Sequence, residues 1–201
     1  MRTLIINNYL PNSPQIEQLY SIIKDVIVHT VELKDYATIG SGENFKLFDI
    51  IVLSGSQRKL AESEVFEDYT NEVEFLRCTE KPVLGICFGH QLLAMAFGAQ
   101  ITPTGKMLEG YYVVRRIEPD KLIEGLGEEF LVMESHEEHI DSVPCNFLKL
   151  ADSPTCPVEI MKHEILPFYG VQFHPERFDD KHPAGVVILE NFFKLASLYT
   201  K

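Results

Sequence analysis

The chain has 201 residues, of which 45% are hydrophobic and 24% charged, and its formal net charge is −12. This length and composition predict one domain, residues 1–201, whose core needs neither disulfides nor a structural metal. The acidic charge excludes a nucleic-acid-binding surface, and no apolar stretch reaches the roughly 18 residues that a membrane span requires.

Strand-like and helix-like patterns alternate through the first hundred residues. Residues 4–6 predict a buried strand, and Ser13 and Pro14 are typical of the N-cap and first position of a helix. Residues 48–53 predict a second buried strand. Apolar residues at helical spacing between Phe66 and Leu76 predict one further helix. A strand at 83–86 and a helix at 90–97 follow.

The second half of the chain has a different pattern. Short strand candidates at residues 111–114, 130–133 and 147–150 are separated by turns, and several of them are expected to be antiparallel. An amphipathic helix is predicted at residues 186–199. Continuous apolar strands alternating with helices are typical of a parallel sheet covered on both faces. We therefore predict an α/β three-layer sandwich with a mostly parallel central sheet and additional antiparallel strands.

The segment GICFG, residues 85–89, lies between the predicted strand at 83–86 and the helix at 90–97. Strand, Gly-x-nucleophile-x-Gly and helix is the layout of a nucleophile elbow, here with Cys87 as the nucleophile. Side chains at Gly85 or Gly89 would crowd such a turn. A thiol at the start of a helix also lies near the positive end of the helix dipole, which favours the thiolate. The alternative is a buried structural cysteine.

His174 is the candidate base for Cys87. It follows the apolar residues 169–173, and in an extended chain Glu176, two residues on, points to the same side. Glu176 can then orient the imidazole while the other ring nitrogen faces the thiol. Both Cys87 and His174 follow strands of the predicted parallel sheet, where catalytic groups collect. The alternative for His174 alone is a histidine in a surface loop.

Acyl transfer also needs donors for an oxyanion. The backbone N–H of Phe88 is one candidate, and Gly55 or Ser56 after the strand at 48–53 is another. From the residues alone, a simple tight turn is the favoured interpretation of Ser54, Gly55 and Ser56.

The segments GICFGHQLL (residues 85–93) and GVQFHPE (170–176) together closely resemble the class I, or triad, glutamine amidotransferases, over nearly the whole chain. The resemblance implies a flavodoxin-like α/β fold without a cofactor. It implies hydrolysis of L-glutamine to glutamate and ammonia through a γ-glutamyl thioester. It assigns Cys87 as nucleophile, His174 as acid and base, Glu176 as its orienting partner, and Gln91 as a contact to glutamine.

Within that family the GMP synthase type is the most similar. The run Met161-Lys162-His163 resembles the corresponding run of that type. Ser135 and His136 resemble its Ser-His segment, whose backbone helps to hold the α-amino and carboxylate groups of glutamine. This chain departs from the type in residues 137–139, Glu-Glu-His. It also has Gly-Ser-Gln at 55–57 in place of Gly-Gly-Pro, so Ser56 stands where the family has a glycine. Positive φ there would cost a serine energy.

Three functions are therefore considered. The leading one is the glutaminase component of an amidotransferase, possessing no synthetase module of its own and passing ammonia to a separate ATP-dependent synthetase subunit. The second is a free-standing γ-glutamyl hydrolase with the same triad. The third is a non-catalytic regulatory module of the same fold, against which the intact Cys87, His174 and Glu176 argue.

No metal site is predicted. His136 and His139 stand beside Glu134, Glu137 and Glu138, but this segment is expected to be a solvated acidic loop because no further ligand cluster accompanies it. The four cysteines have no CxxC spacing, and the N-terminus does not have the pattern of a signal peptide. Both features favour a cytoplasmic location.

Overall fold

The computed structural model describes residues 1–40 and 45–200, so Lys201, the last residue of the predicted domain, lies outside the described range. Within this range the strands are, in chain order, β1 Arg2–Asn7, β2 Thr30–Asp35, β3 Ile50–Leu53, β4 Val83–Ile86, β5 Ile101–Arg116, β6 Glu129–Ile140, β7 Phe147–Asp152, β8 Ile160–His163 and β9 Phe168–Val171. They form one sheet in the order β2-β1-β3-β4-β9-β8-β7-β5-β6.

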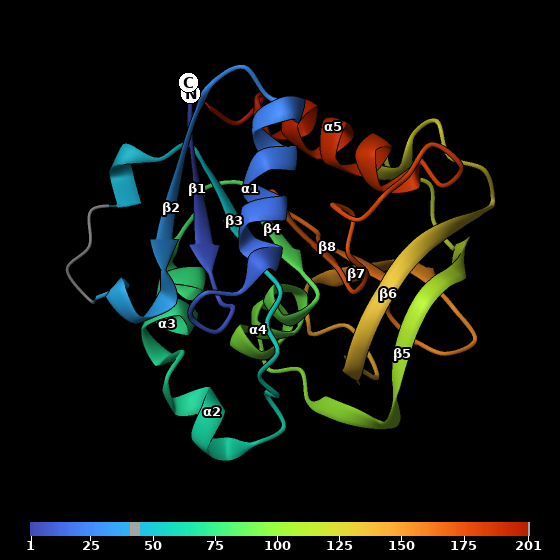
Figure 1. Ribbon diagram of the computed structural model, residues 1–201, viewed down its shortest axis with the longest axis horizontal. Helices are drawn as coiled ribbons and strands as arrows, with labels where there is room; N and C mark the ends of the chain where they lie inside the picture. The colour runs from blue at the N-terminus through green and yellow to red at the C-terminus, as the bar shows by residue number, and fades with distance from the viewer. Residues whose placement is uncertain (41–44, 201) are drawn as a thin grey trace.

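Helices cover both faces of this sheet (Figure 1). The helices are α1 Pro14–Val26, α2 Ser63–Glu67, α3 Thr70–Cys78, α4 Phe88–Ala96 and α5 Ala184–Ala196, with short 3-10 turns η1 Tyr36–Thr38, η2 Phe45–Leu47 and η3 Lys121–Ile123. α1 and α5 share one core cluster, and α3 and α4 share the other. Alternate residues of β3 enter the two clusters, as the two-residue period of a strand requires. The predicted three-layer α/β fold is confirmed.

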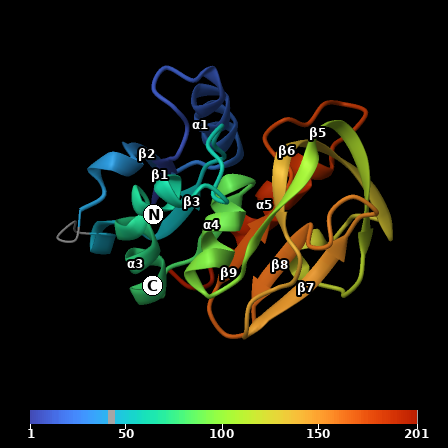
Figure 2. The ribbon, with the colours of Figure 1, turned by 90° about the horizontal axis from the view of Figure 1, so that it is seen from below.

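Strands β2, β1, β3, β4 and β9 are parallel neighbours. β3, β4 and β9 are buried along their whole length, which explains their continuous apolar sequences. Because the strands run in the same direction, the residues that follow β1, β3, β4 and β9 meet at one edge of the sheet. Figure 2 shows this part of the sheet on one side of the molecule and β5, β6 and β7 on the other.

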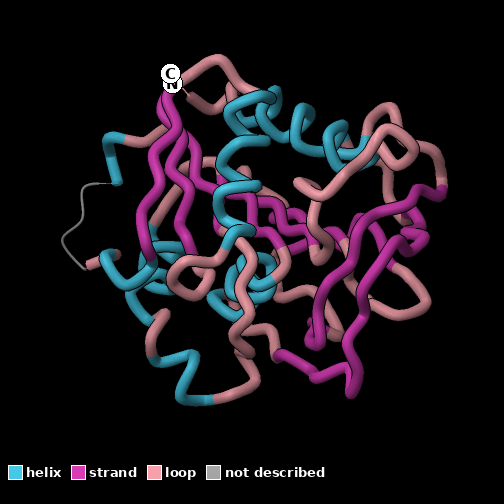
Figure 3. Tube along the Cα trace, in the orientation of Figure 1, coloured by secondary structure: helices cyan, strands magenta, loops and turns pink. Residues whose placement is uncertain are grey.

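From β9 to β6 the pairing is antiparallel. β5 and β6 form a long hairpin, visible as paired strands in Figure 3. Every second residue of β6 is buried, among them Glu134, His136 and Glu138. The expectation of a solvated acidic loop is therefore wrong, because these polar side chains lie on the inward face of a strand.

Several element boundaries differ from the sequence prediction. The second strand begins at Ile50 instead of residue 48. The helix predicted between Phe66 and Leu76 is two helices, because Tyr69, the N-cap of α3, has φ −104° and ψ 9°, which are not helical values. β2 was not predicted, since it lies at the edge of the sheet and its residues are half-exposed or exposed. Ser13 and Pro14 do start α1, although the Ser13 side chain does not cap it.

Candidate active site

Cys87 stands at the turn between β4 and α4, as the N-cap of the helix. Its backbone has φ 51° and ψ −105°, in a region that few residues with a Cβ adopt. The turn is held from both sides: the Cys87 N–H donates to the Val171 carbonyl at 2.8 Å, and the Gln91 N–H donates to the Cys87 carbonyl at 3.1 Å. This is the strained strand-turn-helix geometry of a nucleophile elbow, and it agrees with the prediction from GICFG.

The two glycines of the turn are sterically required. A Cβ at Gly85 would lie 2.5 Å from the carbonyl oxygen of Gly89. A Cβ at Gly89 would lie 2.6 Å from both the Cβ and the carbonyl oxygen of Leu53. The backbones of α4 and of the strands beneath it can approach so closely only because these positions carry no side chain.

Replacing Gly89 with alanine is expected to destabilise the fold by about 2 kcal/mol or more, because the added methyl group overpacks against backbone that cannot move aside. For a chain of this size the melting temperature should fall by roughly 4–8 °C. The matched control is Gly40→Ala, since a Cβ at Gly40 meets no atom of the described residues within 4 Å. Thermal unfolding of both variants checks the prediction, and equal melting temperatures would contradict it.

His174 follows β9 after two residues, Gln172 and Phe173, that are no longer in strand geometry. The chain turns at this point, with the Arg177 N–H donating to the His174 carbonyl at 3.1 Å. Nδ1 of His174 lies 2.7 Å from Oε1 of Glu176, and both side chains are buried. The expected contact is thus present, but a turn makes it, and the expectation that the two residues share one extended edge is wrong.

The pKa values of His174 and Glu176 are each shifted by the charge of the other residue. Burial acts to lower the pKa of His174, but the negative charges of Glu176 and Cys87 and hydrogen bonds to both side chains raise it to about 10. Burial acts to raise the pKa of Glu176, but the charge of His174 outweighs it and the pKa is lowered. Nδ1 carries the proton that it donates to Glu176, which leaves Nε2 for the thiol. With this pKa the His174 imidazole is protonated at neutral pH, between the Glu176 carboxylate and the Cys87 sulfur.

Cys87 and His174 lie at a cavity of about 230 Å³. Of the residues predicted from the sequence, those that line this cavity are Ser56, Cys87, Phe88, Gln91, Ser135, His136 and His174. Gly55 does not line it, but a Cβ at Gly55 would lie 2.9 Å from Cε1 of His174. Glu176 does not line the cavity either, and its contact with His174 places it against the imidazole nitrogen Nδ1.

The candidate oxyanion donors are arranged at the start of α4 and after β3. The Gly89 N–H donates to the Ser54 carbonyl at 3.2 Å. Phe88, one residue earlier, is the first residue of the helix, where an N–H has no acceptor within the helix. Ser56 is not among the described non-glycine residues with positive φ, which are Asn12, Cys87 and Asn146. Ser56 therefore takes the place of the family's glycine without the backbone strain that positive φ would bring.

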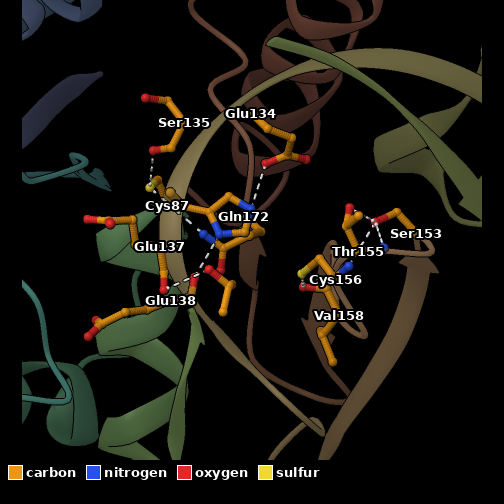
Figure 4. Close-up of polar contacts among 12 residues, drawn as sticks. Cys87, Glu134, Ser135, Glu137, Glu138, Ser153, Thr155, Cys156, Val158 and Gln172 are labelled. Atoms are coloured by element: carbon orange, nitrogen blue, oxygen red, sulfur yellow. Dashed lines mark hydrogen bonds and ion pairs between the residues drawn. The ribbon is translucent and has the colours of Figure 1, made fainter. Parts of the chain in front are cut away.

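The side chains of Gln91 and Gln172 form a chain of hydrogen bonds that reaches the Cys87 sulfur. The Gln91 amide donates to the Glu138 carbonyl at 2.7 Å and to the Gln172 amide oxygen at 3.2 Å. Nε2 of Gln172 in turn lies 3.8 Å from Sγ of Cys87, which also contacts the Ser135 carbonyl at 3.8 Å (Figure 4). Gln172 was not predicted as a site residue, although it lies within the GVQFHPE motif.

The family model of the class-I glutamine amidotransferases matches residues 4–196. The chain belongs to this family. A glutamine-hydrolysing GMP synthase subunit from Archaeoglobus fulgidus is 32% identical over 199 residues, covering 97% of this chain and 98% of the relative. The subunit of the same name from Pyrococcus abyssi is 46% identical over 114 residues, covering 57% of this chain and 60% of the relative, so that match spans less than two thirds of the relative's length.

Solved structures agree with this assignment. A Thermoplasma acidophilum protein described as a GMP synthase subunit superimposes with a TM-score of 0.85 at 25% identity, covering 99% of this chain and 95% of that one. A glutamine amidotransferase of Thermotoga maritima has a TM-score of 0.77 at 16% identity, covering 98% of each chain, and shows the shared fold alone. The resemblance inferred from the two motifs is thereby confirmed.

In this amidotransferase two buried glutamates, Glu134 and Glu159, form an acid pair next to the Ser135–His136 segment. Nδ1 of His136 lies 2.8 Å from the Glu138 carbonyl, which can only accept, so Nδ1 holds the proton. Nε2 lies 3.1 Å from Oε2 of Glu134. Burial raises the pKa of Glu134 to about 7 and lowers that of His136. Burial therefore favours the neutral forms of both the Glu134 carboxyl and the His136 imidazole.

Glu159, fully buried after β7, completes the network. Burial, followed by the charge of Glu134, raises its pKa well above the ordinary value. Two buried carboxyl groups whose charges repel are not both ionised, which favours the protonated form of Glu159. Neither acid was predicted to lie in the interior, because the strands that carry them, β6 and the segment before β8, meet only in the folded sheet.

Replacing Glu159 with glutamine is expected to raise stability at alkaline pH. A carboxyl whose folded pKa is raised destabilises the fold increasingly as pH rises from the ordinary value of about 4 toward the folded pKa. The variant should therefore melt about 2–8 °C above the parent at pH 8, a gain of about 1–2 kcal/mol, and close to it at pH 4. Thermal melts across this range test it, with the exposed Glu17→Gln as control. A constant difference at every pH would contradict it.

Among residues 1–40 and 45–200, no group of three or more His, Cys, Asp or Glu side chains is placed to hold a metal ion. Within the same ranges, no helix has the length and apolarity needed to cross a membrane.

One further residue at the cavity was not predicted. Tyr9 lies just beyond β1 and lines the cavity with Cys87 and His174. The rule that placed Cys87 and His174, that residues after parallel strands share one edge of the sheet, also applies to Tyr9 and was a signal that could have found it.

Proposed function

We propose that the chain is the glutaminase component of an amidotransferase, which hydrolyses L-glutamine to glutamate and ammonia. The observation that carries the proposal is the position of Cys87, held in a strained turn with its thiol against His174, which Glu176 orients. Nucleophile, base and orienting carboxylate in this relation form a catalytic triad.

In the proposed reaction the Cys87 thiolate attacks the γ-carbonyl carbon of glutamine. The negative charge that develops on the carbonyl oxygen is stabilised by the Phe88 N–H and by backbone at Gly55 and Ser56. The His174 imidazolium gives its proton to the departing nitrogen as the C–N bond breaks, which releases ammonia and leaves a γ-glutamyl thioester. His174 then takes a proton from water, whose oxygen attacks the thioester and releases glutamate and the thiolate.

Three residues are proposed to position the substrate. Gln91, Ser135 and His136 line the cavity beside Cys87. The Gln91 side chain is held by Glu138 and Gln172, so its position is set before glutamine binds. In the same way the acid pair fixes the neutral His136 ring, and with it the Ser135 backbone that contacts Sγ.

The partner is proposed to be an ATP-dependent synthetase subunit that accepts the ammonia, and GMP is its proposed product. The curated relatives support this proposal because they are named as subunits of glutamine-hydrolysing GMP synthase. A cytoplasmic location is proposed because the four cysteines, Cys78, Cys87, Cys145 and Cys156, are all free, as in a reducing compartment. One domain spanning residues 1–201 is proposed from the single sheet that the described strands form.

The test is the release of glutamate and ammonia from L-glutamine, measured for the chain alone and with the synthetase subunit that it captures. Equal amounts of both products, formed faster with the partner, are expected. Release of glutamate from larger γ-glutamyl amides, with no synthetase captured, would favour a free-standing hydrolase. A Cys87 that stays unlabelled by a chloroketone analogue of glutamine, with and without partner, would favour a non-catalytic module.

A further inference from the structure

Tyr9 is a buried tyrosine whose hydroxyl has no hydrogen-bond partner among the described residues. Its side chain is only 2% exposed, and the ring packs in the core cluster of α1 and α5. A buried hydroxyl without a partner is unfavourable, so the hydroxyls of tyrosines in cores are normally paired. Tyr69, for comparison, donates its hydroxyl to the Asn8 carbonyl.

The hydroxyl of Tyr9 points to the catalytic residues. A Cβ at Gly55 would lie 2.6 Å from the Tyr9 hydroxyl oxygen and 2.9 Å from Cε1 of His174, so both groups approach the same glycine. Tyr9 also lines the cavity at which Cys87 lies. A side chain at residue 55 would displace the phenol, the imidazole or both. The glycine thus leaves room for the hydroxyl beside the proposed oxyanion backbone.

The charges around Tyr9 keep this hydroxyl protonated. Burial, and then the negative charges of Glu176 and Cys87, raise the pKa of the phenol far above its ordinary value, and nearby Arg177, whose guanidinium can only donate toward the phenol oxygen and offers the O–H no acceptor, opposes this only in part. The hydroxyl is therefore a neutral O–H donor at any physiological pH. Its position and missing partner both indicate an acceptor that arrives with the substrate.

We propose that Tyr9 is a catalytic residue whose hydroxyl donates a hydrogen bond to the γ-carbonyl oxygen of the bound glutamine and to the oxyanion that forms there. This inference rests on the proposed function. Tyr9 adds a side-chain donor to the backbone N–H groups of Phe88 and the Gly55–Ser56 segment. Because the oxygen gains charge as Cys87 attacks, the bond strengthens in the transition state and acts mainly on kcat.

The test is Tyr9→Phe, which removes the hydroxyl and keeps the ring. Tyr169→Phe is the matched control, since Tyr169 is also buried but does not line the cavity. Glutamine hydrolysis, measured with the synthetase subunit present, should lose about 100-fold in kcat in Tyr9→Phe, with KM within about threefold of the parent. Alkylation of Cys87 by iodoacetamide forms no oxyanion, and its rate and pH profile should be unchanged.

Each other outcome is decisive. A kcat equal to that of the parent overturns the inference. Slower alkylation, or a displaced alkylation pH profile, also overturns it, because the hydroxyl then acts on Cys87 or His174 instead of the substrate. A parent protein that releases no glutamate overturns the proposed function and this inference with it. An active parent with an unaffected Tyr9→Phe variant overturns the inference alone. Melting temperatures confirm that both variants are folded.

Discussion

Replacing Cys87 with alanine is expected to abolish the release of ammonia from glutamine, with a loss of about 10⁴-fold or more in kcat. In the proposed mechanism, the Cys87 thiol is the protein group that forms a covalent bond with the substrate. Without it, no γ-glutamyl thioester can form, and the remaining oxyanion donors act only on direct attack by water. Ammonia release under saturating glutamine, with the synthetase subunit present, is the measurement.

The control for this variant is Cys156→Ala. Cys156 is also buried and free, but its thiol contacts the Val158 carbonyl away from Cys87 (Figure 4). This variant should keep full activity with a small loss of stability. Residual ammonia release by Cys87→Ala at more than about a hundredth of the parent rate would contradict a covalent role for the thiol.

Replacing Glu176 with glutamine is expected to lower kcat by about 10³–10⁴-fold while the fold is retained. The amide can hold the imidazole in the wrong tautomer, and it lacks the charge that raises the pKa of His174. Burial then dominates, so the pKa of His174 falls from its value of about 10. The imidazolium that stabilises the thiolate is lost at neutral pH.

The pH dependence of Cys87 alkylation by iodoacetamide measures this effect directly. The parent should react at neutral pH, whereas Glu176→Gln should react at higher pH only. The variant should also be less stable near pH 7. A raised histidine pKa stabilises the fold fully below the ordinary value of about 6.5, and this stabilisation is lost as pH rises through the folded pKa. Glu190→Gln, which removes an exposed carboxylate, is the control. An unchanged alkylation profile in Glu176→Gln would show that Glu176 does not tune His174.

The elbow could be predicted in detail because its constraints are local. Gly85, Cys87 and Gly89 lie within five residues, and the strand before them and the helix after them leave few ways to make the turn. The crowding expected at both glycines is confirmed, because an added Cβ would lie 2.5–2.6 Å from neighbouring atoms. The geometry of residues 85–89 is set by residues that are neighbours in the sequence, so it could be predicted from the sequence.

The His174–Glu176 contact was predicted for a reason that does not hold. Two-residue alternation in a strand suggested it, yet β9 ends at Val171 and a turn forms the contact. Pro175 lies within this turn, where the N–H that it lacks is not needed for strand pairing. The two-residue spacing predicted the contact correctly, although the predicted strand conformation was wrong.

The residues that were missed share one property: their partners are distant in sequence. Tyr9 reaches Gly55 and His174 across the ends of β1, β3 and β9. Glu134 and Glu159 come together only because β6 and β8 belong to the same curled sheet. A pattern of polarity along one strand cannot show which charge lies across from it. In β6, the acidic residues therefore suggested a solvated loop.

By itself the sequence determined the alternation of strands and helices, the turn that presents Cys87 and the contact between the proposed base and its carboxylate. These features depend on periodicity, glycine sterics and short spacing, which neighbouring residues specify. Only the tertiary structure decided the environment of these residues: the buried acid pair beside His136, the glutamines next to Sγ and the unpaired hydroxyl of Tyr9. Burial and charge act through space, and the topology of the sheet decides which side chains share that space.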